Sequence, residues 1–161
     1  FIYVAPRLLA ESGQPLQGWF AHAAPFDFEL GFRPAPGISR FLTGTTTVLS
    51  MKSLEAALEI FSEVLMADIR AKSMSLTGLF IDLFDAHLAP RGFVLESPRD
   101  AESRGSHVAL GFAGAKALVE QMSAEGIIAD FRPPDLMRFG FAPLYNSFGD
   151  VVSLVRHLLR P

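Results

Sequence analysis

The sequence predicts a protein of mixed α and β structure, with helices packed on one face of a small, largely antiparallel sheet. After residue 50 the hydrophobic patterns follow the order helix, helix, strand, strand, helix, strand, strand, helix, which is typical of an α+β layer. Half of the 161 residues are hydrophobic and 19% are charged, as in a well-packed globular chain. Before residue 50, prolines between residues 23 and 37 disfavour helix.

The first fifty residues contain one expected strand and several turns. Residues 1–6 form a short run of apolar, β-branched and aromatic residues that ends at a proline, which predicts a strand. Residues 12–15 predict a turn, and residues 23–37, with three prolines and two glycines, predict an irregular loop.

Two helical patterns follow the loop. The first begins at Ser50, the expected N-cap, and the second covers residues 69–88 and stops at Pro90 and Gly92. A break between them is expected near residues 66–68. The apolar face of the first pattern repeats with a period of 3.6 and consists of Leu54, Ala57, Leu58, Phe61, Val64 and Leu65.

The last seventy residues alternate between strands and helices. Strands are expected at residues 93–95, 107–110, 127–129 and 137–141. A helix over residues 115–125 should end at Gly126, a typical C′ residue. The segment from Ser147 to Asp150 is a capping-box variant that predicts a final helix, with an apolar face of Val151, Val155, Leu158 and Leu159.

Composition argues against several classes of function. The net charge of −3 and the lack of a basic cluster argue against nucleic-acid binding. There is no cysteine, and the four histidines (His22, His87, His107 and His157) lack the i, i+4 spacing of a helical metal pair, so no metal site is expected. No signal peptide and no apolar run of about 18 residues is present, so a cytoplasmic protein without a membrane partner is expected. A mean hydropathy of +0.30 suggests that another segment or a partner covers some apolar surface.

Two groups of motifs resemble the C-terminal part of kynureninase, a family of pyridoxal-phosphate (PLP) enzymes. The first group is Gly18-Trp19-Phe20-Ala21-His22, followed by Pro36-Gly37 and by Phe41-Leu42-Thr43-Gly44-Thr45. The second is the segment from Asp130 to Arg138 with Pro143-Leu144-Tyr145-Asn146-Ser147-Phe148, in the same order as in the family. The likeness runs from the first residue to about residue 160.

The resemblance implies an α/β fold, that of PLP-dependent transferases of the aspartate-aminotransferase type (fold I). Residues 1–50 would then complete the cofactor-binding large domain, and residues 51–161 would form the α+β small domain. It also implies a homodimer, with partner contacts along residues 15–47, a loop that looks too proline-rich to fold on itself.

The resemblance places the Schiff-base lysine of the family upstream of Phe1, so no catalytic residue is expected in this chain, which alone should be inactive. The three lysines, Lys52, Lys72 and Lys116, fall at expected exposed positions of helical patterns. None has the Tyr-Lys context that the family's lysine has.

Trp19 and the Gly44-Thr45 pair are the expected cofactor-side residues. Taken alone, Trp19 could be a core or surface-covering aromatic residue, and Gly44-Thr45 a turn. The resemblance implies that the Trp19 indole donates its N–H to the PLP phosphate, that Thr45 also binds the cofactor, and that Gly44 lies at the substrate. Animal members carry asparagine at the position of Thr45, which leaves the preference for the substrate ring open.

Arg138 is the expected substrate-binding residue. It lies in an apolar, strand-like run, where a guanidinium needs an anionic partner. One interpretation is an internal salt bridge to Asp130 or Asp135. The other is a fork for a substrate α-carboxylate, for which planar arginine is better suited than lysine. The resemblance favours the fork, because Arg138 keeps the family spacing to Pro143-Leu144-Tyr145.

The leading functional hypothesis is therefore a kynureninase-like hydrolase of tryptophan catabolism and NAD biosynthesis, with PLP as cofactor. It would cleave the Cβ–Cγ bond of L-kynurenine, or of 3-hydroxykynurenine, to L-alanine and anthranilate or 3-hydroxyanthranilate. One alternative is another class V PLP enzyme, a transaminase or a desulfurase, although desulfurases usually need a cysteine in this half. The other is a non-catalytic, stand-alone α+β module.

Overall fold

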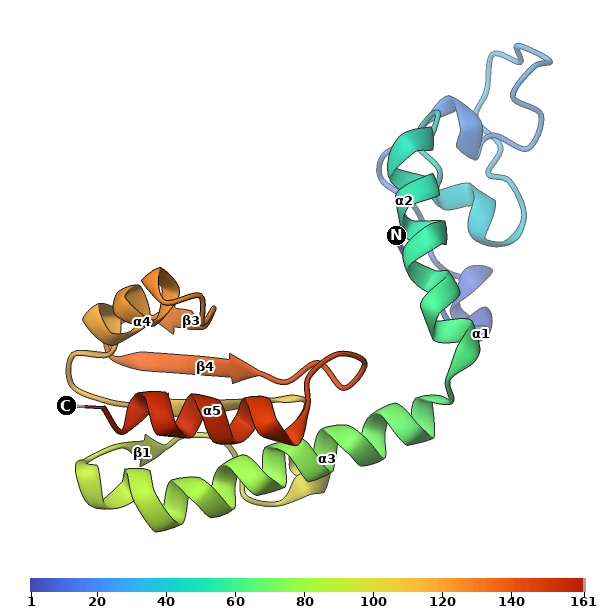
Figure 1. Ribbon diagram of the computed structural model, residues 1–161. Helices are drawn as coiled ribbons and strands as arrows, with labels where there is room; N and C mark the ends of the chain where they lie inside the picture. Colours follow the sequence, from blue (N-terminus) through green and yellow to red (C-terminus); the bar gives the residue numbers. More distant parts are fainter. Residues whose placement is uncertain (161) are drawn as a thin grey trace. The chain divides into compact units, whose positions relative to one another are not determined.

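The computed structural model describes residues 1–160 (Figure 1). The chain divides into two compact units, Phe1–Ile60 and Phe61–Pro161. The assignment of residues 1–50 to a cofactor-binding domain stays a prediction, because compactness alone says nothing of a ligand. None of the helices within residues 1–160 combines the length and the apolar character of a membrane span.

The first unit consists mostly of loops. It contains the helices α1 (Pro6–Leu9) and α2 (Val48–Glu59) and the 3₁₀ turns η1 (Trp19–Ala21) and η2 (Gly37–Phe41). The strand predicted for residues 1–6 is wrong: α1 begins at Pro6, and the residues before it have no regular structure. A strand needs a neighbour for its backbone hydrogen bonds. None of the described residues pairs with this segment, whereas proline suits the first turn of a helix.

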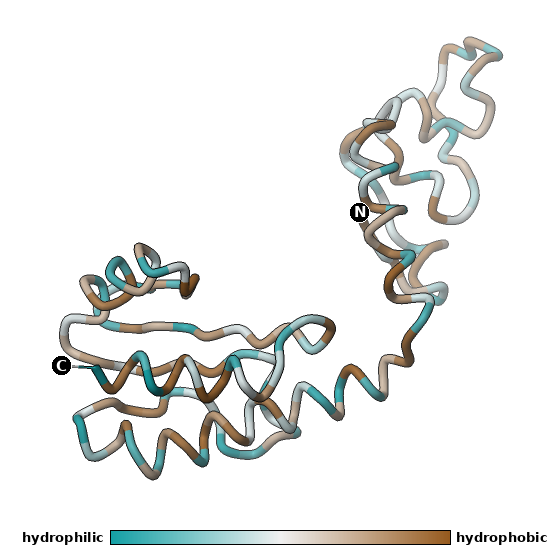
Figure 2. Tube along the Cα trace, viewed as in Figure 1, coloured by the Kyte–Doolittle hydropathy of each residue, from teal (hydrophilic) through white to brown (hydrophobic). Residues whose placement is uncertain are grey.

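Helix α2 begins earlier than its sequence pattern predicts. Its N-cap is Thr47, and Ser50 lies inside the first turn rather than at the cap. None of its residues is buried. Figure 2 shows hydrophobic residues along this helix, and several of their side chains are exposed. These are Val48, Leu49, Met51 and Leu58. The expectation that another segment or a partner covers this surface stays a prediction.

The second unit begins with the long helix α3 (Met66–Leu83), which continues through a π turn, η4 (Phe84–Leu88), and a 3₁₀ turn, η5 (Ala89–Arg91). It ends at Gly92, whose φ of 89° is left-handed and favours glycine. The predicted helix and its end are confirmed. The break from α2 lies slightly earlier than predicted, over residues 60–65, which include the 3₁₀ turn η3 (Ile60–Glu63) and the extended Leu65.

The sheet of the second unit has four antiparallel strands in the order β1-β2-β4-β3, which confirms the predicted sheet type. The strands are β1 (Val94–Leu95), β2 (His107–Gly111), β3 (Asp130–Arg132) and β4 (Leu136–Gly140). A short 3₁₀ turn, η6 (Ala101–Ser103), lies between β1 and β2.

The strand predicted for residues 127–129 is wrong, because β3 begins three residues later, at Asp130. The N–H groups of Gly126 and Ile127 close the preceding helix, α4 (Ala115–Ala124). They donate to the carbonyls of Ser123 and Met122, at 3.1 and 2.9 Å, in a Schellman motif. The chain therefore joins the sheet only after this closure.

Three helices cover one face of the sheet, as predicted. Helices α3, α4 and α5 (Phe148–Leu158) bury their apolar sides against alternate strand residues. On this core face lie Val108, Leu110, Met137 and Phe139. The Phe80 ring of α3 packs at the centre, with its centroid 5.6 Å from that of Phe139. The opposite face of the sheet carries the intervening residues of β2 and β4, among them Ala109 and Arg138.

Candidate functional site

Two motif segments of the first unit meet at Gly18. A Cβ placed on Gly18 would stand only 1.8 Å from the carbonyl oxygen of Thr43. Only a residue without a side chain allows this backbone approach. Because Trp19 follows Gly18 and Gly44 follows Thr43, the approach places the two predicted cofactor-side segments next to each other.

The Trp19 side chain lies beside Gly44. A Cβ built on Gly44 would be 3.8 Å from the indole nitrogen Nε1 of Trp19. The Trp19 ring stacks on Phe20, with centroids 3.8 Å apart, and contacts Phe26 edge-on. Trp19 is nevertheless 50% exposed, and within residues 1–160 its N–H has no hydrogen-bond acceptor. The interpretation of Trp19 as a core residue is therefore wrong: this N–H is an available donor next to a residue without a side chain.

The loop after Trp19 folds back on itself, although its prolines suggested otherwise. The N–H of Ala23 donates to the Arg33 carbonyl at 2.8 Å, and His22 pairs with Pro34 in an isolated bridge. Arg33 donates to both carboxylate oxygens of Glu29, at 2.8 and 2.7 Å, which lowers the pKa of Glu29. Partner contacts along residues 15–47 stay a prediction, but the segment has hydrogen bonds of its own.

His22 orients the start of this loop. Its Nδ1 accepts a 3.0 Å hydrogen bond from the Ala24 N–H, so the neutral ring carries its proton on Nε2. That Nε2 is buried and has no hydrogen-bond partner within residues 1–160; the Glu29 carboxylate lies 3.7 Å away.

Arg138 lies on the open face of the sheet in the second unit. On β4 it stands opposite Ala109 of β2 and opposite Asp130 of β3. Its Nε donates to Asp130 Oδ2 at 2.8 Å, and its Nη2 donates to the same oxygen. The salt-bridge interpretation therefore describes this structure, with Asp130 rather than Asp135 as the partner.

The ion pair leaves much of the Arg138 guanidinium available. The group has five N–H donors, of which Asp130 engages two. The Arg138 side chain is 37% exposed. The Arg138 hydrogen bond, more than any other cause, lowers the pKa of Asp130, while partial burial acts in the opposite direction. The salt bridge and carboxylate binding are therefore compatible, and the substrate role stays a prediction.

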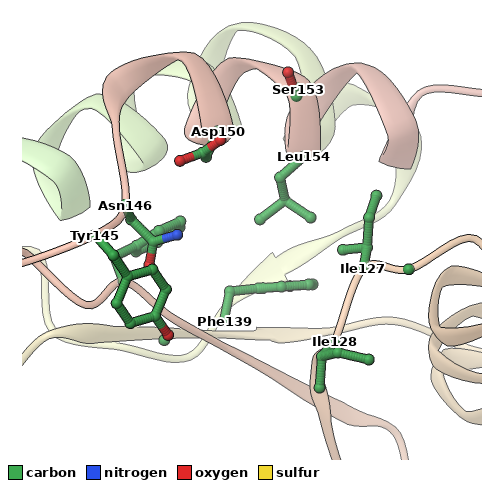
Figure 3. Close-up of a pocket in the computed structure, with 11 residues that line it drawn as sticks. Ile127, Ile128, Phe139, Tyr145, Asn146, Asp150, Ser153 and Leu154 are labelled. Carbon is green, nitrogen blue, oxygen red and sulfur yellow. The ribbon is translucent and has the colours of Figure 1, made fainter.

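The hollow drawn in Figure 3 is not the site of Arg138. Its volume is about 400 Å³, and it lies on the helix face, where Phe139 and Leu154 line it. Two of its four polar side chains serve the local structure: Asn146 Oδ1 accepts from the Ala142 N–H, and Asp150 Oδ2 accepts from the Ser147 N–H. The hydroxyls of Tyr145 and Ser153 are the other polar groups of the lining.

Within residues 1–160, none of the three lysines forms a hydrogen bond or an ion pair with a predicted site residue. Lys52 and Lys116 are exposed and pair with Glu55 and Glu120 on their own helices, as expected. Lys72 differs from the prediction, because it is partly buried and donates to the Pro143 carbonyl at 2.6 Å.

Comparison with known proteins places the chain in a family. The family described as "Kynureninase C-terminal domain" matches residues 69–158. The kynureninase of Pseudomonas fluorescens is 39% identical over 158 residues, which is 98% of this chain and 38% of that protein. The kynureninase of Deinococcus radiodurans is 43% identical over 151 residues, 94% of this chain and 37% of that protein. The chain thus spans less than two fifths of the length of these relatives.

The fold is shared with solved PLP enzymes. The structure of a C-DES mutant, with glycine covalently linked to its PLP cofactor, superposes with a TM-score of 0.76 at 19% identity, over 98% of this chain and 40% of that one. This likeness confirms the predicted fold class, and the family match confirms the resemblance seen in the motifs. Because this family model matches more than half of its residues, the chain belongs to the kynureninase family and contains the family's C-terminal domain.

Proposed function

We propose that this chain is the C-terminal part of a PLP-dependent kynureninase that hydrolyses the Cβ–Cγ bond of L-kynurenine. Water is consumed, and anthranilate and L-alanine are released; with 3-hydroxykynurenine the aromatic product is 3-hydroxyanthranilate. The observation that carries the proposal is the half-exposed Trp19 beside Gly44, whose indole N–H has no acceptor within residues 1–160, in a chain of this family.

The first unit fits the phosphate of PLP. An indole N–H only donates, which suits a phosphate oxygen, and the exposed Thr45 hydroxyl adds a second donor. Gly44 lets ligand atoms approach the backbone next to that indole. Trp19 and Thr45 therefore hold the cofactor in our proposal, and Gly44 leaves room for the substrate. When bound, PLP supplies the electron sink of the reaction.

The second unit recognises the substrate's α-carboxylate through Arg138. The N–H groups that Asp130 does not engage form charge-assisted hydrogen bonds with the carboxylate. This contact selects an α-amino acid over the corresponding amine.

The complete enzyme is proposed to be a cytoplasmic homodimer that acts in tryptophan catabolism and NAD biosynthesis. Symmetric dimers are the commonest oligomers. Apolar side chains are exposed on α2 and on the loop before it, among them Leu30 and Leu49. This exposure supports the proposal that the surface is covered in the assembled protein.

The decisive experiment measures anthranilate release from L-kynurenine by the complete polypeptide with PLP. Release of anthranilate with stoichiometric L-alanine is expected. A protein that retains PLP but leaves kynurenine intact, while it releases sulfide from cysteine, would contradict the proposal and indicate a desulfurase-like enzyme.

A further inference from the structure

We infer that Asp130 is a positioning residue that fixes one edge of the Arg138 guanidinium and so presents the other edge to a substrate carboxylate. This inference rests on the proposed role of Arg138 and adds a second residue to it.

The backbone register places the two side chains together. Asp130 of β3 and Arg138 of β4 are directly paired, and both project from the open face of the sheet. Side chains of directly opposite residues start only about 5 Å apart. A short carboxylate in this place therefore holds the arginine from a fixed point rather than from a flexible loop.

The hydrogen bonds select one edge of the guanidinium. Nε and Nη2 both donate to Oδ2 of Asp130. The whole Nη1 group and the second hydrogen of Nη2 are not used by Asp130. These remaining donors form the pair that matches a carboxylate in a fork geometry. Without Asp130, the long arginine side chain would sample several rotamers, and each would aim the fork differently.

The local charge also favours an incoming anion. Arg132, two residues from Asp130 on the same face, has its Nη2 3.1 Å from the same Oδ2. Two arginines and one aspartate sum to +1, since +2 − 1 = +1. One substrate carboxylate would neutralise the cluster.

The neighbours of Arg138 leave its free edge accessible. The residue opposite it on β2 is Ala109, and two residues further along β4 is Gly140, which has no side chain. His107, opposite Gly140, lies on the same face and is exposed. Small residues therefore lie beside Arg138 on these two sides, and Glu96, whose N–H donates to the Ala109 carbonyl at 3.0 Å, stands beyond Ala109.

The opposite role for Asp130 is that of a competitor, which occupies Arg138 until a substrate displaces it. The two roles predict opposite effects when the carboxylate is neutralised. If Asp130 positions Arg138, its neutralisation should weaken the binding of a substrate carboxylate. If Asp130 competes with the substrate, its neutralisation should tighten that binding.

The experiment uses the complete PLP-loaded polypeptide and compares Asp130→Asn with the control Asp135→Asn. Asp135 is an exposed carboxylate beside the same strands that does not contact Arg138. The probes are L-alanine, the product that carries the α-carboxylate, and kynuramine, which lacks it. For Asp130→Asn we expect the Kd of L-alanine and the KM of L-kynurenine to rise about tenfold or more, the size of a lost charge-assisted hydrogen bond. The inhibition constant of kynuramine should stay unchanged, and the control should change neither.

Asp130→Glu separates positioning from simple charge pairing. It keeps the negative charge but moves the carboxylate outward by one methylene, so the loss of L-alanine binding should persist. Unchanged or tighter L-alanine binding in Asp130→Asn, or an equal loss for kynuramine, would overturn the inference. Arg138→Lys is measured alongside: if it loses L-alanine binding while Asp130→Asn does not, only the role of Asp130 is wrong. If Arg138→Lys keeps full binding, the proposed role of Arg138 fails, and the role of Asp130 fails with it.

Discussion

Gly18 and Thr43 approach each other so closely that no side chain fits between their backbones. The position of a Cβ on Gly18 lies 1.8 Å from the Thr43 carbonyl oxygen and 2.2 Å from its carbonyl carbon. Real Cβ atoms do not come this close to backbone atoms, so any side chain at residue 18 must push the two segments apart. The contact therefore fixes the distance between Trp19 and the segment of Gly44 and Thr45.

Replacing Gly18 by alanine should disrupt this arrangement. The added methyl group meets backbone rather than a flexible side chain, and overpacking of this kind costs about 1–3 kcal/mol. We expect Gly18→Ala to lower the affinity of the complete protein for PLP, measured by titration of the apoprotein. The matched control is Gly13→Ala, where a Cβ meets nothing within 4 Å. Unchanged PLP affinity in Gly18→Ala would show that the approach does not serve the cofactor.

Trp19→Phe and Arg138→Lys should affect different ligands. Phenylalanine keeps an aromatic ring but removes the indole N–H, so Trp19→Phe should weaken PLP binding and leave carboxylate recognition largely intact. We expect the change in a PLP titration, with the KM for L-kynurenine nearly unchanged at saturating PLP. If Trp19→Phe bound PLP with normal affinity, Trp19 would be a surface-covering aromatic residue and not a phosphate ligand.

Arg138→Lys should show the opposite behaviour. An ammonium group cannot reproduce the two parallel hydrogen bonds of a guanidinium on a carboxylate. We expect kcat/KM for L-kynurenine to fall roughly tenfold to a hundredfold, with PLP retention preserved. Loss of cofactor with normal kcat/KM would mean that Arg138 serves only its ion pair with Asp130.

Local signals in the sequence predicted the elements whose hydrogen bonds are local. Hydrophobic patterns with helical spacing identified α3 and α5, and the Ser147-Asp150 pair forms the predicted capping box. Gly126 ends α4 as predicted, with a φ of 84°. These features depend on residues within a turn or two, which a single sequence displays directly.

Features that depend on distant partners were harder to predict. Residues 1–6 have strand-like composition, but a strand forms only where another strand pairs with it. Residues 127–129 are apolar and β-branched, yet helix closure uses the first of their N–H groups. This shift matters for the site, because the true start of β3 at Asp130 is what pairs Asp130 with Arg138. The sequence suggested this ion pair only as an alternative.

The core of the second unit should depend strongly on Phe80. Its side chain is fully buried, and its ring lies 5.3 Å from that of Phe141 as well as against Phe139. We expect Phe80→Ala to lower the free energy of unfolding by about 3–5 kcal/mol in urea denaturation. The control in the same helix, Ser75→Ala, changes an exposed residue and should stay within about 0.5 kcal/mol. A small effect of Phe80→Ala would mean that the surrounding helices close over the cavity.

The capping box of α5 should make stability depend on acidity. The Ser147 N–H donates to Asp150 Oδ2 at 2.7 Å, and this bond, with that of the Ser147 hydroxyl, lowers the pKa of Asp150. A carboxyl whose pKa is lower in the folded than in the unfolded state stabilises the fold above its unfolded pKa, about 3.9. That stabilisation is lost as the pH falls through the folded pKa.

Asp150→Asn should therefore unfold at lower urea than the parent at pH 7. The difference should shrink as the pH drops below about 4, where the carboxyl of the unfolded parent binds a proton before that of the folded parent does. Ser147→Ala removes the hydroxyl that accepts from the Asp150 N–H and should cost about 1 kcal/mol. Because serine does not titrate, part of this loss should persist in acid. The measurement is the urea midpoint of each variant between pH 3 and pH 7. A difference between Asp150→Asn and the parent that stays constant over this range would show that the carboxylate is not what stabilises the start of α5.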